Sequence, residues 1–178
     1  MVQTTFQNRG LIQQGYNQCG IDKLRSLSNG LRFTPTLCMS LAIIGLATQT
    51  PMLHFALAGL GIIPFWFPKY HPFDVLYNKV VRHIFNGQPL PSNPLPRRIA
   101  CVMGGFMNIL IGVAFVMGSP LFANIFGAIL IALQIIVIST HFCVASWMWE
   151  GLSKVLNIRE DPMDVEEAVM RISHGRVK

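Results

Sequence analysis

Long apolar runs alternate with polar stretches along the chain. Four such runs, separated by polar segments, cover approximately residues 32–48, 51–67, 99–117 and 121–149. Roughly 20 apolar residues in helical conformation cross the hydrocarbon core of a bilayer, and about 17 is the short limit. The last run contains no Asp, Glu, Lys or Arg. The pattern therefore predicts an all-α membrane protein with four transmembrane helices.

The turns between the runs predict how these helices pair. Residues 49–50 separate the first two runs, and residues 118–119 separate the last two. Each turn ends in a hydroxyl residue followed by proline, Thr50-Pro51 and Ser119-Pro120. The hydroxyl can cap a helix, and proline fits the first helical position because its missing N–H is not needed there. We therefore expect two helical hairpins.

The segment between the hairpins has helical periodicity of a different kind. Within residues 71–85, apolar side chains recur at spacings of three and four: Phe73, Leu76, Tyr77, Val80, Val81 and Ile84. Charged and polar residues occupy the other side, which predicts an amphipathic helix lying in the cytoplasmic membrane interface. Four prolines in residues 87–96 then predict an extended link.

Both ends of the chain are polar. Residues 1–30 are rich in Gln and Asn, and we expect a loose segment that packs only when a partner is present. The four-span membrane domain would occupy residues 31–157. In the tail, residues 158–178, the Asp161-Pro162 pair predicts the start of a short C-terminal helix.

Composition supports a single membrane domain. Of the 178 residues, 52% are hydrophobic and only 12% are charged, against roughly 25% charged in soluble domains. The net charge of +6 comes from Lys and Arg outside the apolar runs, without the interleaved aromatics of a nucleic-acid surface. We therefore expect membrane lipids as partners and no nucleic acid. By the positive-inside rule, both termini and the central loop are predicted to be cytoplasmic.

Small and polar residues on the last two spans predict how those spans pack. The third span carries Gly104, Gly105, Asn108 and Gly112, and the fourth carries Ala123, Gly127, Gln134 and His141. Small side chains let membrane helices approach closely. We expect these two faces to pack together, with an Asn108 to Gln134 hydrogen bond worth about 1 kcal/mol.

Candidate chemistry is sparse. No nucleophile lies beside a base, no glycine-rich phosphate loop is present, and no span contains a carboxylate. Side chains able to bind a metal in the cytoplasmic half are His71, His83, His141, Cys101 and Cys143. None of them has the spacing of a ligand set, so we predict no metal site and no cofactor.

Three short motifs occur in a characteristic order. They are Pro94-Leu95-Pro96-Arg97-Arg98, then Gly104-Gly105, and finally Phe142-Cys143-Val144-Ala145-Ser146. By order and spacing, residues 30 to 157 resemble a family of small bacterial membrane proteins, the domain of unknown function 4395. The resemblance implies a bacterial inner-membrane location and a last span ending in Phe-Cys-x-x-Cys. Here Ser146 replaces the second cysteine, so Cys143 lacks the dithiol partner that the family pattern implies.

Two functions from different classes are consistent with these observations. The first is a non-catalytic accessory or scaffolding subunit of a larger membrane complex, because the spans contain almost no ionisable groups. The alternative is a membrane thiol-redox or sulfur-handling protein using Cys143, either with Cys101 at the same depth or with a thioredoxin-like partner. On the predicted last span, Ser139, Cys143 and Ser146 share one face that points away from the bundle.

Overall fold

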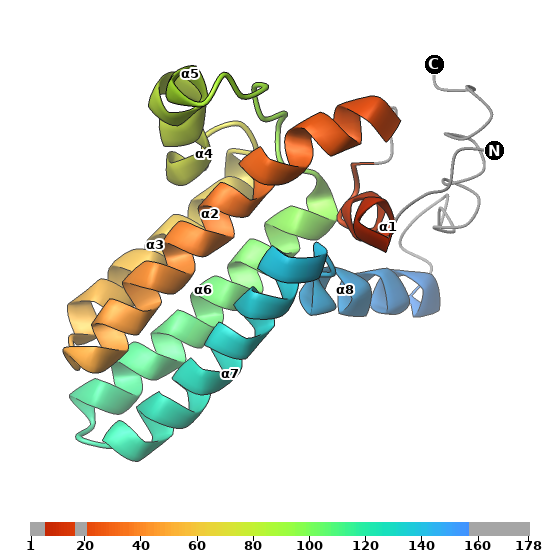
Figure 1. Cartoon of the computed structure of the whole chain (residues 1–178). Helices are drawn as coiled ribbons and strands as arrows, with labels where there is room; N and C mark the ends of the chain where they lie inside the picture. Colours follow the sequence, from red (N-terminus) through yellow and green to blue (C-terminus); the bar gives the residue numbers. More distant parts are fainter. Residues whose placement is uncertain (1–5, 17–20, 157–178) are drawn as a thin grey trace.

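Four long helices form a bundle, and the smaller helices gather at one of its ends (Figure 1). The computed structural model describes residues 6–16 and 21–156, and within these ranges every regular element is helical. The bundle consists of α2 (Ile21–Ala47), α3 (Pro51–Trp66), α6 (Leu95–Val116) and α7 (Pro120–Thr140). The smaller elements are α1 (Phe6–Gln13), α4 (Pro72–Leu76), the π-helical η1 (Tyr77–Val81), α5 (Arg82–Ile84) and α8 (Val144–Val155). The predicted all-helical class is confirmed for this part of the chain.

Within the described ranges, three helices are long and apolar enough to cross a membrane. They are the Lys23–Ala47 part of α2, α6 and α7, with mean hydropathies of 1.4, 2.3 and 2.6. Only 28%, 28% and 17% of their most apolar windows are buried inside the chain, so most of their surface is left to lipid or to another protein. Three helices of this length and composition are compatible with an integral membrane protein. Helix α3, with 16 residues, is shorter.

The prediction of one continuous last span over residues 121–149 is wrong, because the helix stops within this range. Helix α7 ends at Thr140, and His141 adopts a left-handed conformation with φ of 59°. Its N–H donates to the Val137 carbonyl at 2.8 Å, which closes the helix in a C-terminal cap. The chain resumes as α8 at Val144 and runs in a new direction (Figure 1).

The described part of the N-terminal segment, residues 6–16 and 21–30, is packed within the chain rather than loose. Leu11, Ile12 and Tyr16 are buried in one cluster with Leu24 and Leu27 from the start of α2. Helix α2 begins at Ile21, well before the predicted span boundary at residue 32. The cluster explains this extension, because burying the apolar side of the first turns of α2 stabilises them outside the lipid. The predicted C-terminal helix lies outside the described residues.

The predicted interfacial helix forms as three consecutive short pieces, and one of its predicted polar residues, Asp74, is buried. Tyr77 is buried, but Leu76, Val80 and Ile84 are 42%, 49% and 69% exposed. The π-helical turn in η1 adds a residue to the helical repeat, which rotates the positions that follow it. Asp74 precedes this turn and was predicted on the polar side, but it is buried, because Thr34 and Asn93 donate to its carboxylate.

The small-residue seam of α6 packs against α3 and not against α7 as predicted. A Cβ on Gly105 would lie 3.0 Å from the Ala58 carbonyl oxygen, and one on Gly112 would lie 2.8 Å from the Phe55 ring. Asn108 also turns to α3, where its Oδ1 is 3.0 Å from Nδ1 of His54. The hydrogen bond expected between Asn108 and Gln134 is therefore replaced by the one between Asn108 and His54.

The remaining seam residues have separate environments. A Cβ on Gly127 of α7 would lie 2.5 Å from the Leu46 side chain of α2, and Ala123 is fully buried. A Cβ on Gly104 would meet nothing within 4 Å, so this glycine is not needed for close packing. Close approach is instead concentrated where Gly61 of α3 faces Gly105 of α6.

A matched pair of substitutions on α3 tests this close approach. In Gly61→Ala the new Cβ would lie 2.7 Å from the Cys101 carbonyl oxygen, a backbone atom that cannot move aside. We expect a loss of about 1–3 kcal/mol in the free energy of unfolding, the usual cost of overpacking. Gly59→Ala, where a Cβ meets nothing within 4 Å, should leave it unchanged. Unfolding in mixed detergent micelles measures both, and equal stabilities would contradict the packing.

Candidate functional site

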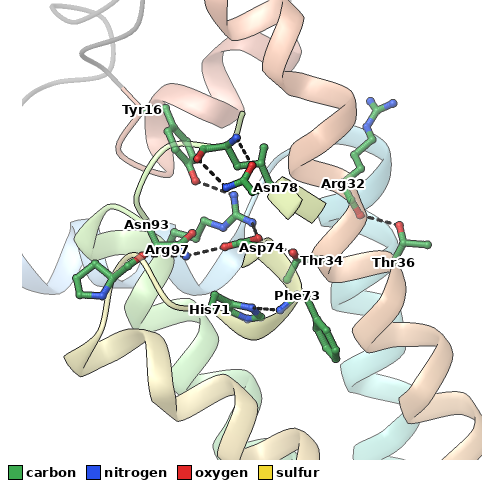
Figure 2. A network of polar contacts seen from close by, with 12 residues as sticks. Tyr16, Arg32, Thr34, Thr36, His71, Phe73, Asp74, Asn78, Asn93 and Arg97 are labelled. Atoms are coloured by element: carbon green, nitrogen blue, oxygen red, sulfur yellow. Dashed lines mark hydrogen bonds and ion pairs between the residues drawn. The ribbon is translucent and has the colours of Figure 1, made fainter. Parts of the chain in front are cut away.

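A buried ion pair lies where the smaller helices meet the bundle. Asp74 of α4 and Arg97 of α6 are 5% and 7% exposed, and Arg97 Nη2 lies 3.7 Å from Asp74 Oδ1. Figure 2 shows Tyr16, Thr34 and Asn93 converging on this pair. The five residues, here called the polar cluster, come from five separate segments of the chain.

Each charge in the polar cluster has neutral hydrogen-bond partners. Thr34 Oγ1 donates to Asp74 Oδ1 at 2.5 Å, and Asn93 Nδ2 donates to Asp74 Oδ2 at 2.7 Å. Arg97 Nη1 donates to the Tyr16 hydroxyl at 2.7 Å. Hydrogen bonds of this kind replace the water that both ions lose on burial.

The local sequence explains why Asp74 points inward. His71 and Pro72 start α4, and His71 Nδ1 accepts the Phe73 N–H at 3.3 Å. This cap places Asp74 in the first turn, where the helix dipole favours a negative charge. The proline-rich link then runs extended, and the Asn93 N–H donates to the Pro68 carbonyl at 3.0 Å, which brings its side chain to the carboxylate.

The charge state of the cluster follows from its contacts. Burial by itself would raise the pKa of Asp74, but the positive charge of Arg97, with smaller contributions from His71 and two hydrogen bonds, holds that pKa below its ordinary value. Burial raises the pKa of Tyr16 to about 12, although the Arg97 charge opposes this shift. Asp74 is therefore ionised and Tyr16 neutral at neutral pH.

A cleft of about 550 Å³ adjoins the polar cluster. Arg97 and His71 line it beside the cluster, and α2, α3, α6, α7 and the start of α8 form its largely apolar walls. Three thiols also line it: Cys38, Cys101 and Cys143. The cleft is therefore the place where most of the candidate residues from the sequence meet.

Two polar atoms at this cleft have no hydrogen-bond partner among the described residues. They are Nε2 of His141, whose residue is only 2% exposed, and Oε1 of Gln134. Burial and the nearby Arg32 and Arg97 charges lower the pKa of His141 to about 4, so its imidazole is neutral at neutral pH. The cleft thus combines apolar walls with two uncharged, unsatisfied polar groups.

Helix α1 fixes the turn that carries His141 and Cys143. Gln14 Nε2 donates to the His141 carbonyl at 2.6 Å, and the Cys143 N–H donates to Gln13 Oε1 at 3.4 Å. A Cβ on Gly10 would lie 2.7 Å from the His141 carbonyl carbon, so this glycine permits the contact. The N-terminal segment therefore holds one wall of the cleft in place.

The remaining predicted residues have the following positions. His83 is exposed, away from the cleft. Among the described residues, no three His, Cys, Asp or Glu side chains are grouped to hold a metal ion.

Cys143 and Ser146, predicted to face away from the bundle, are 9% and 0% exposed, and Ser146 Oγ donates to the Pro96 carbonyl at 3.2 Å. The helix break at His141 turns this face inward.

Sequence reasoning missed Asp74 as the centre of the cluster. It was predicted on the polar face of a surface helix, since helical periodicity alone places it there. One signal was available, because Asp74 is the only acidic residue between Asp22 and Glu150. A lone carboxylate among the basic residues of a membrane protein is a candidate for a specific ion pair.

Replacing Asp74 tests the cluster. In Asp74→Asn the buried Arg97 charge loses its counter-ion, so we expect about 3–5 kcal/mol less free energy of unfolding at pH 7. The folded-state pKa of Asp74 is below its unfolded value, so wild type loses this stabilisation as the pH falls through the folded pKa. The difference between the two proteins should therefore shrink in acid.

Unfolding in mixed detergent micelles at several pH values measures this difference. Thr34→Val, which removes one hydrogen bond to the carboxylate but no charge, is the control. It should cost less, about 1.5–3 kcal/mol. An Asp74→Asn protein as stable as wild type at pH 7 would show that the pair does not hold these segments together.

The family model described as domain of unknown function (DUF4395) matches residues 28–154, a range that includes α3, α6, α7, most of α2 and nearly all of the cleft. No curated protein and no solved structure matches the chain. The resemblance inferred from the three short motifs is confirmed, and the chain belongs to the DUF4395 family.

Proposed function

We propose that the protein is a non-catalytic accessory or scaffolding subunit of a larger membrane complex. Helix α3 serves as a short fourth span, giving two hairpins with the small helices on the cytoplasmic side. The basic residues support this orientation, because those of the bundle helices lie toward the end with the small helices, and both short turns at the other end are uncharged. The family resemblance supports the bacterial inner membrane as the location.

The outward face of α3 carries the subunit proposal. Met52, Ala56, Gly59 and Ile63 follow one another along this face and are all exposed. A Cβ on Gly59 would meet nothing within 4 Å, so no contact inside the chain requires a glycine there. Contact with lipid favours larger apolar side chains, whereas small residues allow another helix to approach closely. This surface, here called the α3 face, suits a transmembrane helix of another subunit.

Filling the α3 face tests the proposal. Gly59→Leu should block close approach of a partner helix and reduce co-purification of partner subunits at least tenfold, while the chain itself remains folded. Ala132→Leu places the same side chain on an exposed position of α7 and is the control. Extraction of native membranes in mild detergent, followed by affinity purification and quantitative mass spectrometry, measures the retained partners.

Two outcomes would contradict this proposal. One is the recovery of wild type only as an isolated monomer under mild extraction. The other is equal retention of partners by the Gly59 and Ala132 variants, which would place docking elsewhere on the surface.

The alternative is a membrane thiol-redox or sulfur-handling protein. The observation that favours it is that Cys38, Cys101 and Cys143 all line the same cleft. The thiols do not face a protein surface, since Cys143 is 9% exposed and the other two are partly buried. Such an activity would therefore act on a small lipophilic thiol or sulfur compound and not on a protein partner.

Alkylation tests the thiol activity. If Cys143 is the working thiol, N-ethylmaleimide should label it in native membranes, and Cys143→Ser should abolish the cellular phenotype of the wild-type gene. Cys38→Ser, which removes another thiol of the same cleft, is the matched control and should retain function. An unlabelled Cys143 together with full function of Cys143→Ser would exclude this alternative.

A further inference from the structure

We propose that the cleft binds an uncharged lipid whose head carries two hydrogen-bonding oxygens, the chemistry of a lipid quinone or quinol, with His141 and Gln134 as its polar contacts. This binding site is independent of the α3 face and goes beyond the proposed subunit role. It rests on the size of the cleft, its two unsatisfied polar atoms, its charge and its opening.

The dimensions and walls of the cleft fit a small ligand. Its volume of about 550 Å³ lies within the range of roughly 300–1,000 Å³ typical of ligand sites. Such sites are largely apolar with a few placed polar groups, and Leu57, Leu130, Leu133 and Val137 supply apolar walls here. The polar groups then define what the head of the ligand must offer.

His141 supplies the first contact. Its ring is buried and its Nε2 has no partner among the described residues, a costly arrangement unless a ligand supplies one. The bond from Gln14 to its carbonyl fixes the backbone that carries the ring. A neutral imidazole can donate or accept at Nε2 depending on its tautomer, so either a carbonyl or a hydroxyl oxygen satisfies it.

Gln134 supplies the second contact. It precedes His141 by seven residues, which is two helical turns or roughly 10 Å along α7. A ligand that bonds to both side chains therefore needs two separate hydrogen-bonding atoms in its head. Since an amide can present either its oxygen or its nitrogen, Gln134 can also serve a carbonyl or a hydroxyl group.

The charge of the cleft favours an uncharged head. Arg97 lines it, but the Asp74 carboxylate balances this charge and the Tyr16 hydroxyl accepts from Nη1. His141 is neutral at neutral pH because burial lowers its pKa to about 4. An anionic head would therefore meet an Arg97 charge that is already balanced by Asp74.

The cleft opens toward the region occupied by lipid. Met103, Phe106 and Ile129 line it, and these residues of the membrane spans are 38%, 59% and 46% exposed. A ligand can therefore enter sideways from the bilayer and leave an apolar tail between these side chains.

Binding of a defined probe tests the proposal. The full chain is purified in maltoside micelles, and a fully substituted benzoquinone with a decyl tail, which cannot add to thiols, is titrated by equilibrium dialysis. We expect saturable binding of one molecule per chain. His141→Asn, which tolerates the left-handed backbone, and Gln134→Leu should each weaken it about three- to tenfold, the usual effect of losing one hydrogen bond. His83→Asn, at an exposed histidine away from the cleft, should bind like wild type.

A second measurement on wild type does not depend on how well the variants fold. Bound quinone should slow the alkylation of Cys101 by a membrane-permeant maleimide, since this thiol lines the cleft. Absence of saturable binding, absence of protection, or unchanged affinity in both folded cleft variants would overturn the proposal. Oleate binding with the same dependence on His141 would also overturn it, because the site would then take an anionic head.

Discussion

The Asp74 to Arg97 ion pair is the contact on which the cytoplasmic end of the proposed arrangement depends. Through its hydrogen-bond partners it joins the N-terminal segment, α2, α4, the proline-rich link and α6. A buried pair of this kind contributes little net stability compared with apolar packing, but losing one member leaves an uncompensated charge. Its role is therefore to specify how five segments meet, and one wall of the cleft depends on that arrangement.

The bundle itself depends on a different kind of contact. Gly61 and Gly105 bring the backbones of α3 and α6 together, and the His54 to Asn108 hydrogen bond lies on the same seam. Helix α7 packs less tightly against α6, and the cleft lies in the space lined by these helices, α2 and the start of α8. Residues of α3, such as Leu57 and Gly61, line this cleft together with residues of α7, such as Leu130 and Leu133.

The sequence predicted features that depend on local pattern. Apolar length located the helices, and Thr50-Pro51 and Ser119-Pro120 located two helix starts. The sequence did not predict the features that depend on tertiary contacts. The small residues of α6 predicted close packing, but they did not show which helix α6 packs against. The left-handed residue at His141 leaves no signal in the periodicity of the sequence. The burial of Asp74 likewise requires Arg97, Thr34 and Asn93 to meet from distant parts of the chain.

The helix break at His141 also sets the thickness of membrane that the chain fits. With 21 residues, α7 is about 31 Å long, close to the hydrocarbon thickness of an average bilayer. A helix continued to residue 149 would be roughly 13 Å longer and would have to tilt strongly to remain in lipid. The break at His141 therefore keeps α7 at a length that can cross a bilayer without strong tilt.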